Sequence, residues 1–88
     1  MKQKIFIADD HPLFLKGLKG FLEENNFDVI GEAPNGELAL KFIQEIEPHL
    51  AILDLDMPGL SGLEVAKMCH EKEIQTKIIL LTFHKESY

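Results

Sequence analysis

Cysteine and basic residues are scarce in this 88-residue chain, and each scarcity argues against a class of protein. The single cysteine, Cys69, cannot form an internal disulfide, which fits a protein of the reducing cytoplasm. Cys69 lies in a helical pattern, where a small buried hydrophobic residue is the usual explanation. Nine Lys and Arg residues stand against fifteen Asp and Glu, for a formal net charge of -6. Because nucleic acids are bound by clustered basic side chains, this segment is not expected to contact them directly.

The sequence also has no long apolar run, and its histidines are not spaced like the ligands of a metal site. The apolar run near the N-terminus ends before Asp9, which makes it too short for a signal-peptide core or a membrane span. The histidines show no spacing typical of a zinc site, and His11 is interpreted as a solvated turn residue beside Pro12. Apolar content of 45% and charged content of 27% are ordinary for a globular protein, and this length allows at most one domain.

What the sequence does contain is a strict alternation of strand and helix patterns. Strands are predicted over residues 4–8, 27–33, 50–54 and 77–82, and helices follow Pro12, the Asn35-Gly36 turn and a Ser61/Glu64 capping box. Gly17 is predicted on the buried face of the first helix. The other predicted inward-facing residues are Leu13, Phe14, Leu18, Phe21 and Leu22 in the first helix, Leu38, Ala39, Phe42, Ile43 and Ile46 in the second, and Leu63, Ala66 and Cys69 in the third.

This alternation predicts an α/β fold with helices on both faces of a mostly parallel sheet, because β-α-β crossovers are right-handed. Acidic residues end two of the strands: Asp9 and Asp10 follow the first, and Asp54 closes the third. Because parallel strands end at one edge of the sheet, three carboxylates are expected to meet there. Because the three negative charges would repel one another, we expect a bound Mg²⁺ to offset the repulsion. A phosphoryl group is in turn a typical ligand of Mg²⁺. The sequence therefore predicts a phospho-acceptor module.

Three segments, IFIADDHPLFLKGL, LAILDLDMPGLSGLEV and KIILLTFHKESY, carry a family resemblance in this order and spacing. Together they resemble the receiver domain of two-component response regulators, particularly the NarL subfamily whose receivers precede a LuxR-type DNA-binding domain. The resemblance covers residues 1–88 as one receiver domain, incomplete at its C-terminus. It implies a flavodoxin-like open sheet of order 2-1-3-4, with the fifth strand of the 2-1-3-4-5 order and the last helices missing.

The resemblance also implies a role for each residue of the site. Asp54 resembles the aspartate that accepts a phosphoryl group from a histidine kinase. Asp10 and Asp54 would bind Mg²⁺ directly, Asp9 would act through a water molecule, and the backbone carbonyl of Asp56 would be a further ligand. Thr82 resembles the switch residue whose hydroxyl turns towards the phosphate. The family also has a lysine and an aromatic switch residue on its fifth strand, and the sequence ends before either. The implied role is signalling, with transcription control in the full-length protein, rather than enzymatic catalysis.

Two alternatives remain open from the sequence. Asp54-Leu55-Asp56 also resembles the DxD motif of haloacid dehalogenase-type phosphatases, although Pro58 stands where that family has Thr or Val. The chain could instead be a receiver-like interaction module that is not phosphorylated. With the strand order 2-1-3-4, the fourth strand is expected to form a sheet edge whose residues 78–81 pair or pack against another chain in a homodimer or higher oligomer.

Overall fold

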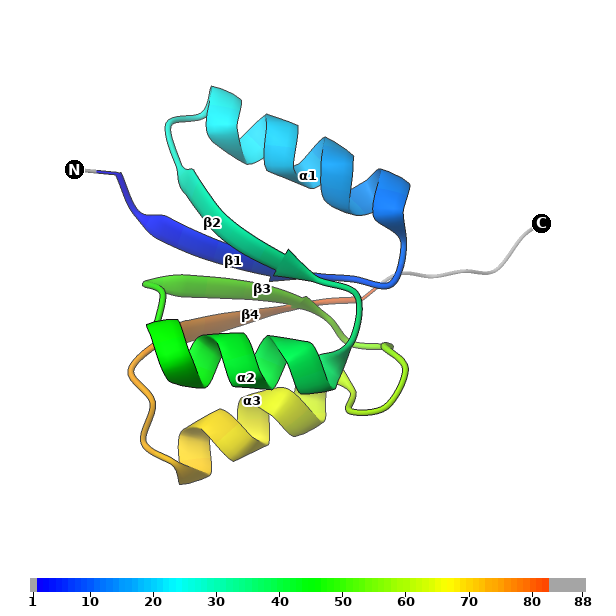
Figure 1. Cartoon of the computed structure of the whole chain (residues 1–88), viewed down its shortest axis with the longest axis vertical. Coiled ribbons are helices and arrows are strands. Elements are labelled where there is room, and N and C mark those ends of the chain that lie inside the picture. Colours follow the sequence, from blue (N-terminus) through cyan, green and yellow to red (C-terminus); the bar gives the residue numbers. More distant parts are fainter. Residues whose placement is uncertain (1, 83–88) are drawn as a thin grey trace.

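The computed structural model describes residues 2–82, which form a four-stranded parallel sheet flanked by three helices (Figure 1). The strand order is β2-β1-β3-β4, which confirms the predicted flavodoxin-like arrangement. The fourth strand ends one residue earlier than predicted and the second begins one residue later. The sequence of residues 83–88 also predicts the start of a further helix, and this prediction lies outside the described residues. The elements are β1 (Lys4–Ala8), α1 (Pro12–Glu24), β2 (Asp28–Ala33), α2 (Gly36–Ile46), β3 (Leu50–Asp54), α3 (Gly62–Glu71) and β4 (Lys77–Leu81).

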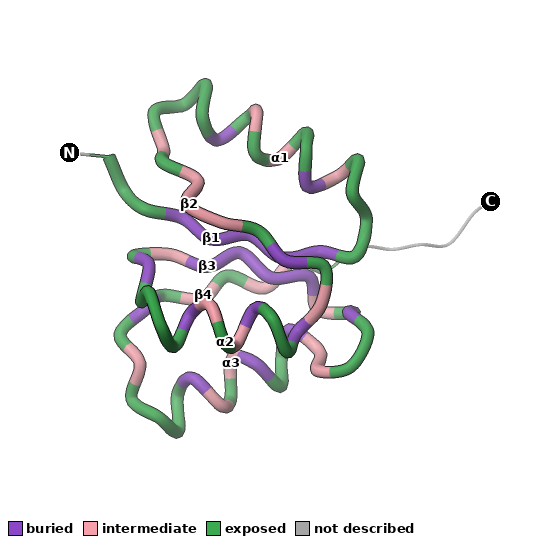
Figure 2. The backbone as a smooth tube through the Cα atoms, viewed as in Figure 1, coloured by how far each residue is buried: buried purple, intermediate pink, exposed green. Residues whose placement is uncertain are grey.

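The sheet separates two hydrophobic clusters, because successive residues of a strand point to opposite faces. Helix α1 covers one face, whereas α2 and α3 lie side by side on the other (Figure 1). In β1, Ile5 and Ile7 pack towards α1, and Phe6 and Ala8 pack towards α2 and α3. Figure 2 shows β1 and β3 as the most continuously buried strands. Burial on both faces fixes the positions of the C-terminal ends of β1 and β3, where Asp9 and Asp54 lie.

The predicted inward faces of the helices are only partly correct. In α1 the buried residues are Leu15 and Leu22, whereas Leu13 is 84% and Phe21 62% exposed. Gly17 is exposed as well, and a Cβ added there would meet no heavy atom within 4 Å beyond its own stretch of helix backbone, so it does not serve close packing. The reason is geometric: apolar residues surround much of α1, and only those pointing at the sheet are buried. The other predicted core residues that are exposed are Leu38, Ile46 and Leu63.

Side-chain hydrogen bonds cap the starts of α2 and α3, and the one at α3 was predicted. The Asn35 side chain accepts a hydrogen bond from the Leu38 N–H (2.9 Å) at the start of α2. At α3, the Ser61 hydroxyl accepts from the Glu64 N–H (3.1 Å) while the Glu64 carboxylate accepts from the Ser61 N–H (2.9 Å). This reciprocal pair is the predicted capping box, and it fixes where the loop after β3 returns to the sheet.

Strand β4 lies at one edge of the described sheet and pairs there with β3. Its side chains are incompletely covered: Ile79 is 42% exposed, and Ile78, Leu80 and Leu81 are half-buried. Cys69, by contrast, is buried as predicted, and burial raises the pKa of its thiol. Within residues 2–82 we find no helix with the length and apolar character needed to cross a membrane.

Candidate functional site

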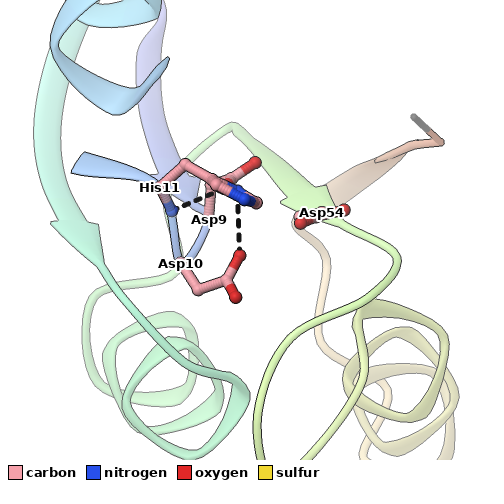
Figure 3. A group of neighbouring side chains, drawn as sticks. All are labelled: Asp9, Asp10, His11 and Asp54. Carbon is pink, nitrogen blue, oxygen red and sulfur yellow. Dashed lines mark hydrogen bonds and ion pairs between the residues drawn. The ribbon is translucent and has the colours of Figure 1, made fainter. Parts of the chain in front are cut away.

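The three predicted carboxylates come together where β1 and β3 end. Ala8 of β1 and Leu53 of β3 are paired neighbours, so the residues that follow them, Asp9 and Asp54, lie at the same edge of the sheet. One ligand atom from each of Asp9, Asp10, His11 and Asp54 lies within 4.8 Å of the others. Figure 3 shows Asp54 across from the Asp9–His11 segment. The expected meeting of three carboxylates at one sheet edge is therefore confirmed.

Burial makes the negative charges of this cluster energetically unfavourable unless a positive partner is bound. Asp9 and Asp54 are each only 1% exposed, whereas the Asp10 side chain is 32% exposed at the mouth of the site. The Asp9 Oδ2 atom is buried and accepts no hydrogen bond from the described residues. A buried carboxylate oxygen without a partner is costly, and a bound cation would remove that cost. Because all three acids offer hard oxygen donors, the set fits Mg²⁺.

His11 belongs to this cluster, which the sequence interpretation as a solvated turn residue missed. Its Nδ1 lies 2.7 Å from Asp9 Oδ1 and 3.0 Å from Asp10 Oδ1. Its backbone N–H also donates to Asp9 Oδ1 at 2.8 Å. Since a carboxylate oxygen can only accept, the ring nitrogen donates in this arrangement. The position of His11 directly after Asp9 and Asp10 was the feature of the sequence that could have indicated its place in the cluster.

The loop after β3 places backbone groups beside Asp54. The Asp56 N–H donates to Asp54 Oδ1 at 3.2 Å, while the Asp56 side chain is exposed. The Leu55 N–H donates to the Leu81 carbonyl at 2.9 Å, which extends the β3–β4 pairing to the end of β4. Thr82 follows directly and is exposed at the same edge of the sheet as Asp54. The switch role of Thr82 remains a prediction.

Two glycines hold this loop in place. Gly59 has φ +73, a left-handed conformation that favours glycine. Gly62 begins α3 with its Cα against the end of β3: an added Cβ would overlap the Asp54 carbonyl oxygen and lie 3.0 Å from the Asp54 carbonyl carbon. The Gly62 N–H donates to the Leu55 carbonyl at 3.0 Å. The N-terminus of α3 is therefore packed directly against the backbone that carries Asp54.

Comparison with known proteins gives one consistent result. Residues 5–88 match the response regulator receiver domain family. The transcriptional regulatory protein YdfI of Bacillus subtilis is 43% identical over 86 residues, which cover 97% of this chain and 40% of YdfI. The chain thus spans about 40% of the length of the curated relatives it matches.

Solved structures agree. The signal receiver domain of the response regulator NarL from Mycobacterium tuberculosis superposes with a TM-score of 0.91 at 37% identity, covering 97% of this chain and 69% of that one. The isolated receiver domain of RcsB from Salmonella enterica, solved in the presence of the phosphomimetic BeF3⁻, gives a TM-score of 0.84 at 29% identity. That match covers 98% of this chain and 65% of the RcsB chain.

Proposed function

The chain belongs to the response regulator receiver domain family, with NarL-type relatives, and we propose on this premise that Asp54 accepts a phosphoryl group from a histidine kinase with Mg²⁺ bound beside it. The observation that carries this proposal is the convergence of Asp9, Asp10 and Asp54 within 4.8 Å at the end of the two central strands. A phosphomimetic in the structure of the related RcsB receiver domain supports it.

The described residues suit this transfer. An Asp54 carboxylate oxygen attacks phosphorus, the phosphorus–nitrogen bond of the phosphohistidine breaks, and its electron pair returns to the kinase imidazole. Asp54 thereby becomes an acyl phosphate. A bound Mg²⁺ would offset the repulsion between the carboxylates and the incoming phosphoryl group. The Asp56 N–H, already directed at Asp54 Oδ1, orients the acceptor group.

The remaining ligand and switch assignments are part of the same proposal. Asp10 and Asp54 would hold the metal directly, Asp9 would act through water, and the Asp56 backbone carbonyl would be a further ligand. Thr82 turns its hydroxyl towards the phosphate after transfer. Its exposed position directly after β4, whose last residue pairs with Asp54, supports this assignment. Residues 1–88 act together as one receiver domain.

The output and partners follow from the relatives. YdfI is described as a transcriptional regulatory protein, and this chain matches 40% of it. We accordingly infer that the receiver controls transcription in the cytoplasm through a separate DNA-binding part, while residues 1–88 make no direct contact with nucleic acid. We also propose that the 88-residue chain forms a homodimer or higher oligomer through β4, supported by the partial exposure of Ile79 at the sheet edge.

The test is phosphate incorporation from acetyl phosphate, measured by intact-mass spectrometry with and without Mg²⁺. We expect one phosphoryl group per chain, dependent on Mg²⁺, and no incorporation into an Asp54→Asn variant. Asp56→Asn is the matched control, because its exposed carboxylate has no proposed role and its backbone is retained. Equal labelling of the Asp54→Asn variant would refute the assignment.

The same experiment separates the alternatives. A receiver-like interaction module that is not phosphorylated would show no labelling of the wild-type chain. A haloacid dehalogenase-type phosphatase would instead hydrolyse a generic phosphatase substrate. The family match and the strand order β2-β1-β3-β4, with Asp54 on the third strand along the chain, favour the receiver.

A further inference from the structure

His11 is the one member of the acidic cluster that offers nitrogen rather than oxygen. Its side chain is 50% exposed, so it lies at the mouth of the site with Asp10 rather than in the core. Two contacts to Asp9 Oδ1, from the ring Nδ1 at 2.7 Å and from the backbone N–H at 2.8 Å, hold the imidazole against the carboxylates (Figure 3). His11 makes no capping bond to α1 with its side chain, which instead contacts the two carboxylates.

The spacing of the His11 ring nitrogen and the Asp10 carboxylate suits neighbouring ligands on one ion. Two adjacent ligands at about 2.1 Å from an octahedral metal lie roughly 3.0 Å apart. His11 Nδ1 is 3.0 Å from Oδ1 of Asp10, a proposed direct ligand. The buried Asp9 Oδ2, which accepts no hydrogen bond from the described residues, independently indicates that the site is built for a positive partner.

We propose that His11 is a fourth, nitrogen ligand that makes this site bind divalent transition-metal ions such as Ni²⁺ more tightly than Mg²⁺. The inference rests on the metal site of the proposed function. Binding of an ion between the carboxylates would displace the Nδ1 proton that His11 donates to them and use the freed Nδ1 lone pair. Imidazole suits Ni²⁺ and Zn²⁺, whereas Mg²⁺ prefers oxygen ligands and keeps several of its waters. His11 therefore contributes to the binding of one class of ion and not the other.

The test is calorimetric titration of the 88-residue chain with Ni²⁺ and, separately, with Mg²⁺. His11→Gln removes the nitrogen ligand while keeping a polar side chain of similar length at an exposed position. We expect its Ni²⁺ affinity to fall by about tenfold or more, since loss of even an indirect partner of a metal costs that much, and its Mg²⁺ affinity to stay unchanged. His70→Gln, which removes an exposed histidine near the far end of α3, is the matched control and should change neither affinity. Excess Mg²⁺ should release Ni²⁺ if both ions use one site.

Two outcomes would overturn the inference. Unchanged Ni²⁺ affinity in His11→Gln would show that the imidazole is not a ligand. An equal fall for Ni²⁺ and Mg²⁺ would show that His11 only positions the carboxylates. Thermal unfolding of the variant checks that it is folded. These titrations do not depend on phosphorylation, so the two proposals can fail separately. Absence of phosphate on Asp54 would refute the proposed function but not the nitrogen ligand. Normal phosphorylation of Asp54 with unchanged Ni²⁺ binding in His11→Gln would refute the nitrogen ligand but not the proposed function.

Discussion

Replacing Gly62 with alanine should damage both the stability of the fold and the geometry of the site. The added Cβ would overlap the Asp54 carbonyl oxygen and lie 3.0 Å from the Asp54 carbonyl carbon and 3.2 Å from Leu55 Cα. All three are backbone atoms at the end of a central strand, so no side-chain rotation can relieve the overlap. Either α3 must move away from the sheet, which disturbs the loop whose Asp56 N–H donates to Asp54, or the end of β3 must shift, which displaces the Asp54 carboxylate from Asp9 and Asp10.

The size of the effect follows from overpacking. Forcing an extra methyl group into a close-packed contact typically costs about 1–3 kcal/mol of unfolding free energy. For a domain of this size, each kcal/mol lowers the melting temperature by about 4–8 °C. We therefore expect a lower midpoint in urea denaturation, a lower melting temperature, and weaker Mg²⁺ binding measured by calorimetry.

Gly17→Ala is the matched control, because it makes the same chemical change in a helix. A Cβ at Gly17 would meet no heavy atom within 4 Å beyond the local helix backbone, and the residue lies exposed in the middle of α1. Alanine there should raise the unfolding free energy by about 0.5–1 kcal/mol through helix propensity and leave Mg²⁺ binding unchanged. A Gly62→Ala variant as stable as the wild type, with unchanged Mg²⁺ affinity, would refute the argument that α3 positions Asp54.

Further predictions concern the metal ligands, a helix cap and the sheet edge. In calorimetric titrations Asp10→Asn should weaken Mg²⁺ binding more than Asp9→Asn, because a direct charged ligand contributes more than one acting through water; equal losses would contradict the proposed ligand set. Ser61→Ala removes the capping hydrogen bond of α3 and should cost about 1 kcal/mol in urea denaturation, and an unchanged midpoint would show the cap to be unimportant. Ile79→Lys should reduce self-association measured by light scattering. Leu63→Lys, which replaces a similarly exposed residue away from the sheet edge, should leave self-association unchanged. A monomeric wild-type chain would refute the proposal that β4 pairs with another chain.

The meeting of the carboxylates could be predicted from the sequence because it depends only on topology. An apolar run that ends in an acid, repeated on two parallel strands, must place both acids at the same sheet edge. Asp9 and Asp54 follow this rule directly, since their strands are paired neighbours. The helix caps at Asn35 and Ser61 were equally predictable, because they involve only residues close in sequence.

Side-chain orientation was less predictable, since it depends on how elements meet in space. Apolar residues surround much of α1, so their spacing alone could not show that Leu15 and Leu22 face the sheet while Leu13 and Phe21 face outward. The contact of His11 with Asp9 depends on the turn that the backbone takes after β1. Likewise, the contact of Gly62 with the Asp54 carbonyl depends on the docking of α3, which no local pattern specifies.

Phosphorylation of Asp54 can be tested by chemical identification of the residue that carries phosphate. An acyl phosphate on aspartate is reduced by borohydride to an alcohol, which converts the modified residue to homoserine, whereas phosphate esters on serine or threonine are not converted. After incubation with acetyl phosphate and Mg²⁺, reduction and peptide sequencing by mass spectrometry should find homoserine at position 54 alone. Homoserine at Asp9, Asp10 or Asp56, or none at position 54 in a chain that has taken up phosphate, would contradict the assignment of Asp54 as the phospho-acceptor.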